Sequence, residues 1–477
     1  MTLRLYNSLS RSLEDFAPAH PPVVKVYGCG PTIYGLAHIG NFRTFMAYDL
    51  FNRYLRWKGW EPRFVVNFTD VDDKTIDGAA KAGKQLAEFT EPFGEAFEAD
   101  CNTLGIRAFH AIPRATHHVD EMIDWIRRLE DKGLAYKADD GSVYFRISEF
   151  ENYGALSGNR ADGTEGRSRI DSDEYDKDDV RDFVLWKASR DADREVGAVW
   201  ASPWGEGRPG WHLECSVLSI GALGETLDVH IGGEDLLFPH HENEIAQSEG
   251  VTGCTFARHW LHTKHLRVEG QKMSKSLGNT YTVPDLIEKG FQPASVRHLL
   301  ISAQYRKELN FTFDGLEGSN RVVQRLTALH RRLRETRTED GAPDTGLAVL
   351  AADALKGFEA ALDDDLNVSE AFSALFGMLS GTNTALDSAN GPVHPAGLKA
   401  IADALDSMDS VFGILELALS TDAPDEELAA WVEGLIEERK AVRAAKNWAR
   451  ADEIRDELAA RGVVLEDTAE GTRWSVQ

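Results

Sequence analysis

The sequence predicts an α/β protein whose first domain contains a parallel sheet. Val23–Tyr27 is a short run rich in β-branched residues that ends in a Gly-Cys-Gly-Pro turn, and Phe64–Phe68 is a second apolar run. Between them, from Asn41 to Gly59, hydrophobic residues recur at spacings of three and four, which is typical of an amphipathic helix. A strand, a helix and a strand in such close succession form a βαβ unit, so we expect the ligand at the carboxyl ends of the strands.

Three further parts follow this first domain. Ala161–Asp182 is polar, acidic and without periodicity, which is typical of a loop or an inserted segment. After Asp314, four segments with helical periodicity predict a helical bundle. They are Leu316–Leu333, Leu347–Leu362, Ala371–Leu386 and Leu398–Leu417. A polar break at Ser420–Asp425 precedes one long amphipathic segment that runs to Ala460, which predicts a small separate C-terminal module.

The composition limits the class of protein. The chain has 477 residues, 42% of them hydrophobic, and its net charge is 52 − 78 = −26, so we expect a folded protein of several domains that does not coat nucleic acid non-specifically. Four cysteines are too few for a disulfide framework, which leaves metal binding, catalysis or burial as their roles. No segment approaches the roughly 20 apolar residues of a membrane span. We expect a cytoplasmic protein without a membrane partner.

The segment His38-Ile-Gly-Asn41 lies at the predicted start of the first helix. Backbone N–H groups and the helix dipole favour an anion there, and Gly40 lets a nucleotide approach the backbone. His38 and Asn41 could add hydrogen-bond donors to a triphosphate. Taken alone, such a tetrapeptide is more often a helix cap with a surface histidine. The chain has no Walker A loop and no GxGxxG loop.

A second candidate for phosphate binding is the loop Lys272–Asn279, which reads Lys-Met-Ser-Lys-Ser-Leu-Gly-Asn. Lys272 and Lys275 could clamp phosphates in a transition state. The alternative is an ordinary solvated surface loop. The pairing of this loop with His38–Asn41 behind a βαβ unit resembles the paired signatures of class I aminoacyl-tRNA synthetases, which favours the phosphate interpretation.

Four residues are candidate metal ligands: Cys29, Cys215, His240 and Glu244. His240 and Glu244 are four residues apart, which places them on one face if the segment is helical. Two thiolates, an imidazole and a carboxylate suit Zn²⁺. The spacing alone does not choose His240 over His241 or Glu242, and it does not exclude the later histidines His259, His262 and His265.

A set of motifs, in one order along the chain, is similar to the cysteinyl-tRNA synthetase family. The resemblance extends from the first strand to Arg473-Trp474. The motifs are Gly28-Cys-Gly-Pro-Thr-Ile-Tyr34, His38–Asn41, Asn67-Phe-Thr-Asp-Val-Asp-Asp-Lys74, Pro209-Gly-Trp-His-Leu-Glu-Cys215, His230-Ile-Gly-Gly-Glu-Asp235, Phe238-Pro-His-His-Glu-Asn-Glu244, Lys272–Ser276, Leu362-Asp-Asp-Asp-Leu-Asn367 and Ala451-Asp-Glu-Ile-Arg455.

The resemblance implies a role for each matched residue. One zinc ion per chain would be held by Cys29, Cys215, His240 and Glu244. Thr69, Trp211 and Asp235 would line the amino-acid pocket, with Asp235 facing the substrate ammonium. His38, Gly40, Asn41 and Lys275 would bind ATP, which is expected with Mg²⁺, and His38, Asn41, Lys272 and Lys275 would act in catalysis.

The reaction implied is activation of L-cysteine by ATP, followed by transfer of cysteine to the terminal adenosine of tRNA(Cys). Packing separates near-isosteres such as cysteine and serine only about 10- to 200-fold. Zinc binds a thiolate far better than a hydroxyl. We therefore expect selection through zinc, no editing domain and, from the family, a monomer.

The resemblance also implies a domain plan. A Rossmann-like catalytic domain would comprise residues 1–119 and 206–313, interrupted by an insertion at 120–205. A helical bundle at 314–419 and a small C-terminal domain at 420–477 would bind tRNA, the latter at the anticodon. Two basic segments are candidate contacts: the six arginines between Gly318 and Arg337, and Arg439–Arg450, where Arg439, Arg443, Lys446 and Arg450 would form one helical stripe. A solvated helix face is the alternative for both.

Two positions depart from the commonest family pattern. The first signature ends in Asn41 rather than a second histidine, and Gly35 stands where an aspartate is common. Two other functions compete with the synthetase. One is a cysteine ligase of the mycothiol pathway, which joins activated cysteine to an amino sugar but typically lacks the C-terminal module; the other is an inert zinc- and RNA-binding paralogue. Intact His38, Lys272 and Lys275 argue against the second.

Overall fold

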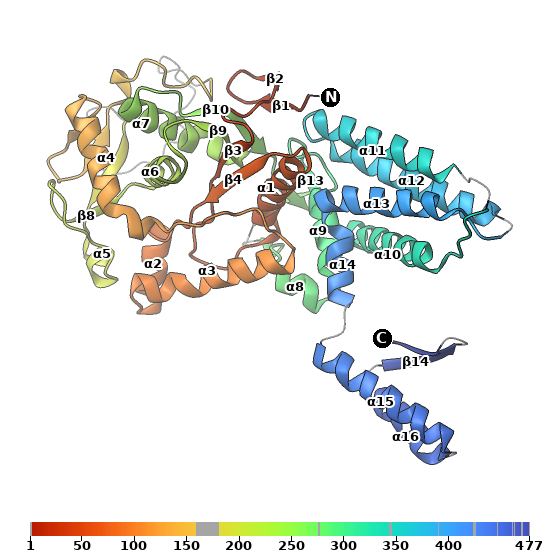
Figure 1. Ribbon diagram of the computed structural model, residues 1–477. Helices are drawn as coiled ribbons and strands as arrows, with labels where there is room; N and C mark the ends of the chain where they lie inside the picture. The colour runs from red at the N-terminus through yellow and green to blue at the C-terminus, as the bar shows by residue number, and fades with distance from the viewer. Residues whose placement is uncertain are drawn as a thin grey trace. The chain divides into compact units, whose positions relative to one another are not determined.

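The structure is a computed structural model, and its contacts divide the chain into two units, Met1–Ile414 and Leu415–Gln477. It describes residues 2–158, 181–274, 277–342, 346–389, 391–422, 426–445, 447–459, 461, 463–468 and 471–476. Figure 1 shows the elements of both units in chain order, and each unit is described by itself.

A four-stranded parallel sheet forms the centre of the first unit. Its order is β10-β9-β3-β4, and all three pairs of neighbours are parallel. The strands are β3 Val23–Gly28, β4 Glu61–Val66, β9 Leu227–Gly233 and β10 Ala257–Thr263. The predicted α/β class with a parallel sheet is therefore confirmed, although β4 begins and ends earlier than Phe64–Phe68.

Helices cover both faces of this sheet (Figure 1). Side chains alternate between the faces of a strand, and the end of β3 shows which helix lies on each face. Tyr27 belongs to the same buried cluster as Cys215 of α6 Trp211–Leu223. The next residue, Gly28, faces the ring of Tyr48 in α1 Ile39–Trp57. Helices thus pack on both faces of the sheet at the carboxyl end of β3.

Shorter elements complete the catalytic half of the unit. Those before the insertion are β1 Arg4–Asn7, β2 Ser12–Asp15, α2 Asp73–Ala82, α3 Leu86–Thr103 and η1 Ala115–His118. Those after it are η4 Glu234–Leu236, η5 Leu237–His241, α7 Glu242–Thr252, β11 Leu266–Val268, β12 Gln271–Lys272, α8 Val283–Glu288, α9 Pro293–Ile301 and β13 Leu309–Phe311. β11 pairs with both β12 and β13.

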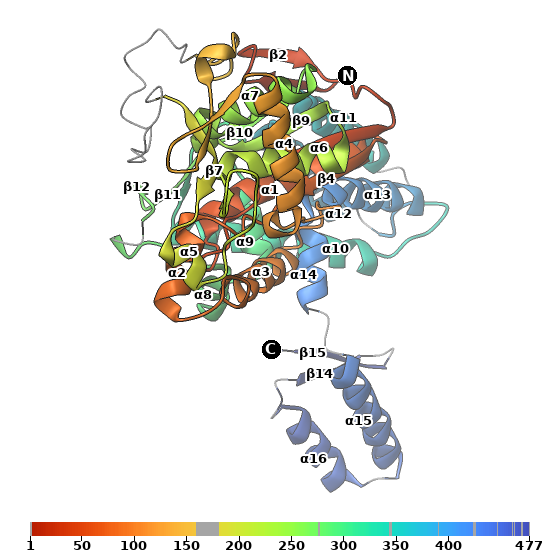
Figure 2. The same cartoon turned by 90° about the vertical axis from the view of Figure 1, so that its left-hand side faces the viewer.

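The region between the two halves of the sheet forms a second, antiparallel sheet of four strands, in the order β5-β6-β7-β8. Figure 2 shows one of its strands, β7, and the helix α4 that precedes it in the chain. Its elements are α4 Val119–Asp131, β5 Ala135–Lys137, β6 Val143–Phe145, η2 Ile147–Glu149, β7 Phe183–Ala188, α5 Asp191–Glu195 and β8 Gly207–Pro209. Most of the predicted loop at Ala161–Asp182 lies outside the described residues. Arg208 and Lys187 of this region pair with Asp73, which anchors the antiparallel sheet to α2.

The predicted helical bundle is present, as α10 Phe313–Glu335, α11 Leu347–Asp363, α12 Val368–Ser388 and α13 Pro395–Phe412. The prediction of one helix over Leu398–Leu417 is wrong. Gly413 adopts a left-handed conformation with φ 62° and ends α13, as is common at helix C-termini. A new helix, α14 Ile414–Asp422, follows it.

Within its described residues, the second unit contains α14 from Leu415 onward, two further helices and a hairpin, and the last three have a small core of their own. The further elements are α15 Glu426–Ala444, α16 Trp448–Ala459, β14 Val463–Thr468 and β15 Gly471–Val476, and the core includes Val432, Ile454 and Leu458. The single long helix predicted up to Ala460 is wrong. The side chain of Asn447 accepts a hydrogen bond from the Arg450 N–H at 3.3 Å, and such a cap starts a new helix.

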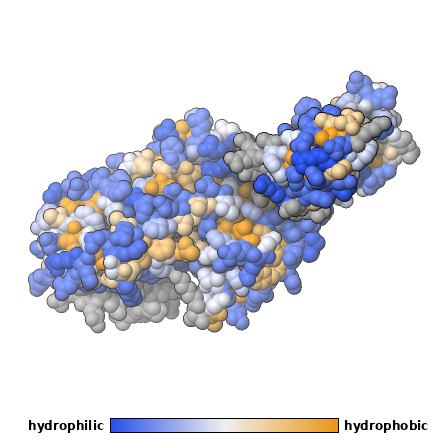
Figure 3. All heavy atoms as spheres, turned by 90° about the horizontal axis from the view of Figure 1, so that it is seen from below, coloured by the Kyte–Doolittle hydropathy of each residue, from blue (hydrophilic) through white to orange (hydrophobic). Residues whose placement is uncertain are grey.

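The surface is predominantly polar on the face seen in Figure 3, where hydrophobic residues form small separate groups. Within the described residues, every helix is too short or too polar to cross a membrane.

Candidate metal and nucleotide site

Two cysteines that are distant in the chain meet beyond the ends of the central strands. Cys29 directly follows β3, and Tyr48 holds this turn by donating to the carbonyl oxygens of Cys29 and Ile231, at 3.2 and 3.0 Å. Cys215 lies near the start of α6, which crosses behind the same strand. The two Sγ atoms are 3.9 Å apart, and both side chains are buried.

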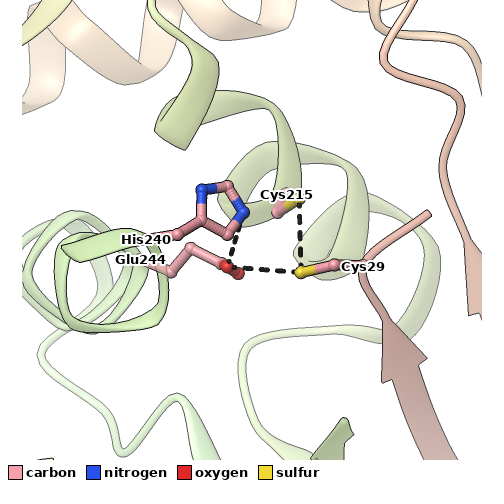
Figure 4. Close-up of side chains that lie close together, drawn as sticks. All are labelled: Cys29, Cys215, His240 and Glu244. Carbon is pink, nitrogen blue, oxygen red and sulfur yellow. Dashed lines mark hydrogen bonds and ion pairs between the residues drawn. The ribbon is translucent and has the colours of Figure 1, made fainter. Parts of the chain in front are cut away.

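His240 and Glu244 approach the two thiols from η5 and the first turn of α7 (Figure 4). His240 Nε2 lies 3.1 Å from Glu244 Oε1, and Cys29 Sγ lies 3.7 Å from the same oxygen. The ligand atoms of all four residues lie within 4.8 Å of one another. The structure therefore brings together the four residues that the sequence singled out.

A second set of four overlaps the first. Cys29, His230, His241 and Glu244 also lie close enough together to hold a metal ion. His241 Nε2 is 3.3 Å from Cys29 Sγ, and His230 Nε2 is 2.8 Å from Glu244 Oε2. The choice between neighbouring histidines, which the sequence left open, is thus also a choice between two adjoining sites that share Cys29 and Glu244. Glu242 belongs to neither group; its carboxylate accepts from the backbone of Gly154 and Ser157.

Burial controls the protonation of this cluster. It raises the pKa of the Cys29 thiol and of the Glu244 carboxyl, and it lowers the pKa of the His240 imidazole. Each group is therefore held in its uncharged form. A divalent cation would reverse this for the acids, because it stabilises thiolate and carboxylate and accepts neutral imidazole as a ligand. The donor types and their burial fit zinc.

A group of further histidines surrounds the cluster. His212 Nδ1 lies 2.9 Å from His240 Nδ1, and His241 Nδ1 lies 2.8 Å from His262 Nε2. His230 stacks on Trp260. The sequence left His262 open as a possible ligand and gave His212 and His230, which lie within matched motifs, no role at the site. A usable signal was present, because nearly half of the chain's 15 histidines lie between His212 and His265.

The three residues predicted to line the amino-acid pocket differ in their exposure to solvent and in their contacts. The ring of Trp211 stacks on His240, with centroids 4.4 Å apart, and 36% of Trp211 is exposed. Thr69 is buried, and its Oγ1 accepts a hydrogen bond from Asn67 Nδ2 at 3.0 Å. Asp235 is exposed in η4, directly after the carboxyl end of β9. Trp211 thus presents a partly exposed ring beside His240, and Asp235 lies in the short segment that connects β9 to η5.

The two predicted phosphate segments also lie together. His38 caps α1: the Asn41 N–H donates to His38 Nδ1 at 3.2 Å, and the His38 N–H donates to Asn41 Oδ1 at 3.0 Å. A Cβ on Gly40 would clash with Cε of Met273, which follows the exposed Lys272. The helix cap that the sequence offered as an alternative is therefore present, in contact with the second loop. Lys275 lies outside the described residues.

The basic segment of the second unit does not form the single helical stripe that its spacing predicts. α15 ends at Ala444 and α16 begins at Trp448, so Arg443 and Arg450 lie on different helices, and Lys446 lies outside the described residues. Arg450 donates to three carboxylates at 2.8, 3.3 and 2.8 Å, those of Glu438, Glu453 and Glu457. The pKa of Arg450 is raised by these hydrogen bonds.

The arginines of the bundle are differently placed. Arg325, Arg331 and Arg332 line a groove between α10 and α12. Arg332 donates to Asn383 and Asp387, at 2.8 and 2.5 Å. Arg325 and Arg331 are exposed, so this groove presents positive charge to the solvent.

Family comparisons cover most of the chain. Residues 15–321 match the tRNA synthetases class I (C) catalytic domain, residues 357–416 match the DALR domain, and residues 425–474 match the cysteinyl-tRNA ligase anticodon binding domain.

Individual relatives are similar over the full length. The chain is 46% identical to the cysteine–tRNA ligase of Solibacter usitatus (strain Ellin6076), with 99% of each chain covered. It is 45% identical to that of Chlamydia trachomatis serovar A, again with 99% of each covered.

Among solved structures, methionyl-tRNA synthetase of Mycobacterium tuberculosis in complex with methionyl-adenylate aligns with a TM-score of 0.59 at 17% identity, covering 83% of this chain and 91% of that one. The LeuRS in a ternary complex from Agrobacterium radiobacter K84 also aligns with a TM-score of 0.59, at 13% identity and with 85% and 86% covered. At these identities the likeness describes the fold.

Proposed function

We propose, from the premise that this chain belongs to the cysteine–tRNA ligase family of class I aminoacyl-tRNA synthetases, that it attaches L-cysteine to tRNA(Cys) in two steps. Attack of the cysteine carboxylate on the α-phosphorus of ATP forms cysteinyl-adenylate and releases pyrophosphate. The cysteinyl group then passes to the 3′-terminal adenosine of the tRNA, releasing AMP. The single observation that carries this proposal is the buried Cys29, Cys215, His240 and Glu244 cluster at the carboxyl ends of the central strands.

We assign one zinc ion to Cys29, Cys215, His240 and Glu244. When bound, zinc supplies a soft Lewis acid that favours a thiolate over a hydroxyl. The adjoining set around His230 and His241 is also buried, but it lies against Trp260, which is 1% exposed. His240 instead stacks on the partly exposed Trp211. A substrate thiol entering from the solvent therefore reaches the set that contains His240.

The substrate amino acid would bind on the open side of the cluster. Trp211 would form one wall, and Thr69 would lie at the base; the hydrogen bond from Asn67, which orients the Thr69 hydroxyl, supports this role. Asp235 is exposed at the end of β9, where its carboxylate can attract the substrate ammonium. Charge attraction orients the backbone of the amino acid, and the thiol distinguishes its side chain. Together these contacts hold the carboxylate for attack on ATP.

ATP with Mg²⁺ would lie over the start of α1. The backbone at Gly40 and the N-terminal end of the helix can receive phosphates, and His38 and Asn41 can donate if their mutual hydrogen bonds exchange for bonds to the nucleotide. Lys272 and Lys275 would neutralise charge that develops on the phosphates. The contact between Gly40 and Met273 supports placing both segments on one nucleotide.

The tRNA would contact the bundle and the small C-terminal unit. The exposed Arg325 and Arg331 support a contact to the phosphate backbone. The match of residues 425–474 to an anticodon binding domain supports the anticodon end for the second unit. We also propose a cytoplasmic monomer with domain boundaries at residues 119, 313 and 419. The insertion runs past the predicted boundary at residue 205 to Pro209, because β8 pairs with β7.

The test is transfer of labelled cysteine, with ATP, to bulk bacterial tRNA, with glucosaminyl-inositol as the acceptor in a parallel reaction. We expect label on tRNA alone; label on the sugar alone would assign the chain to thiol biosynthesis instead. The zinc assignment is tested separately, by pyrophosphate exchange with cysteine or serine before and after chelation. Appreciable serine activation by the zinc-loaded enzyme would overturn selection through the metal.

A further inference from the structure

The motif Leu362–Asn367 contains a buried aspartate that joins three distant parts of the first unit. Asp365 Oδ1 accepts from the Tyr6 N–H at 2.8 Å and from the Tyr305 hydroxyl at 2.7 Å. Its Oδ2 accepts from Arg306 Nε at 2.6 Å and from Gln304 Nε2 at 3.0 Å. One carboxylate at the turn between α11 and α12 thus binds the N-terminal hairpin and the segment Gln304–Arg306.

The backbone around Asp365 is strained. Asp365 and Leu366 have φ values of 56° and 54°, in the left-handed region that side chains other than glycine rarely adopt. Such a conformation persists when surrounding contacts hold it in place, and it is found at functional positions. Here Asp365 N donates to the Arg4 carbonyl at 2.9 Å, so the turn is fixed through its backbone as well as its side chain.

The segment that Asp365 binds is also held from the catalytic side. Arg43 of α1 donates to the carbonyl oxygens of Ala303 and Gln304, at 2.9 and 2.8 Å. The N–H of Lys264, after β10, donates to the Tyr305 carbonyl at 2.8 Å. These bonds do not involve the bundle. Loss of the Asp365 carboxylate would therefore release the turn between α11 and α12 from this segment and leave the segment in place beside β13. The rest of the bundle would stay bound at the end of α1, where Lys58 pairs with Glu359 and Asp363.

We propose that Asp365 is a positioning residue for the transfer step: its carboxylate fixes the turn between α11 and α12 against Gln304–Arg306, and so holds the arginine-lined bundle in register with the catalytic sheet. The inference rests on the proposed tRNA function of that bundle. Adenylate formation needs the sheet and its loops alone, so it should not depend on Asp365. Transfer needs the tRNA acceptor end to reach the adenylate, so it should.

The test compares the two half-reactions in the full chain carrying Asp365→Asn. This change keeps the size of the side chain but turns an amide toward the donors of Arg306 and Gln304. We expect kcat/KM for tRNA to fall by about tenfold, within the usual range of coupling between sites. Cysteine-dependent pyrophosphate exchange should stay unchanged. Asp364→Asn is the matched control, because Asp364 is the exposed neighbour in the same turn, and it should alter neither.

Equal losses in both half-reactions, or no loss in either, would overturn the proposal. If Asp365→Asn does not fold, Arg306→Gln is tested instead, because the Arg306 side chain is 34% exposed. This variant should lower kcat/KM for tRNA by a smaller factor and leave pyrophosphate exchange unchanged. If kcat/KM for tRNA does not fall, the inference is likewise overturned. A parent chain that shows no cysteine-dependent exchange, or exchanges but charges no tRNA, would refute the proposed function itself. That failure is distinguishable because it concerns the parent and not the variant.

Discussion

The cluster around Glu244 and the basic segment that ends at Arg450 are both built from ionisable residues, yet the fold treats them in opposite ways. The cluster collects acids and imidazoles in a buried place where burial keeps each of them uncharged. The basic segment lies at the surface, where three glutamates surround Arg450. The resemblance of its motifs to a known family pointed to the residues of the first, and the structure shows them buried together, where groups of this kind must be satisfied by one another or by a cation. Charge counting misjudged the second, because it ignores carboxylates that neighbouring turns and helices contribute.

The largest effect is expected where a buried ligand is removed. Cys215→Ser should lower kcat/KM for cysteine in pyrophosphate exchange by at least about 100-fold, as large as the greatest losses seen when the support of a metal ligand is removed. Bound zinc, measured by elemental analysis, should fall from one per chain. Cys101→Ser is the control, because Cys101 is also buried but lies in α3, outside the cluster. If Cys215→Ser kept one zinc ion per chain, Cys215 would not be a zinc ligand, and the buried cluster would not differ from the surface segment in needing a cation.

The next comparison separates the two overlapping metal sets. His240→Asn should lower zinc retention and cysteine activation by about 100-fold, whereas His241→Asn should lower them by about tenfold, the range for a residue that supports a ligand. His241 contacts Cys29 and His262 and would act on the site through them. The opposite order of effects, measured by zinc titration of the two variants, would assign the metal to the set with His230.

The sequence predicted the elements whose periodicity is strong and local. The βαβ unit and the four bundle helices follow from hydrophobic spacing, and the helix breaks do not. Gly413 ends α13 and Asn447 caps the start of α16, and each is a single residue within an otherwise helical pattern. The antiparallel sheet of the insertion was not predicted either, because β5 and β6 have three residues each, too few to show alternation.

The sequence likewise predicted one part of the candidate site and missed another. Motif order pointed to Cys29, Cys215, His240 and Glu244, but no periodicity relates residues that lie on three different segments. The surrounding His212 and His262 could be placed only by the fold, since their contacts depend on how α6 and β10 pack around η5. The charge of a surface helix is the hardest feature to predict, because it depends on partners from other turns and helices.

A smaller effect is expected at the surface groove of the bundle. Neutralising two exposed groups with Arg325→Gln and Arg331→Gln should raise KM for tRNA by about tenfold and reduce the salt slope of tRNA binding by about one for each phosphate that is no longer neutralised. Arg450→Gln should alter that slope much less, because its guanidinium already binds three glutamates. Salt titrations of tRNA binding give both values. If Arg450→Gln reduced the salt slope as much as the two bundle substitutions do, Arg450 would contact tRNA phosphates in spite of its glutamate partners.

The smallest effect concerns a buried carboxylate outside the metal cluster. Asp100 in α3 is 7% exposed, and burial raises its pKa to about 6. The pKa of an aspartate in an unfolded chain is about 3.9. Between this pH and the pKa of folded Asp100, the folded protein therefore binds more protons than the unfolded one. The free energy of unfolding therefore decreases as pH rises from about 3.9 to about 6, and the full loss of stability is reached above about pH 6. Asp100→Asn should raise Tm by about 2–4 °C at pH 8 and by less near pH 4. Thermal melts at the two pH values measure this, with the exposed Asp364→Asn as the control. An equal rise in Tm at both pH values would show that the pKa of Asp100 does not lie in this interval. Burial would then raise the pKa of Asp100 less than it raises that of Glu244.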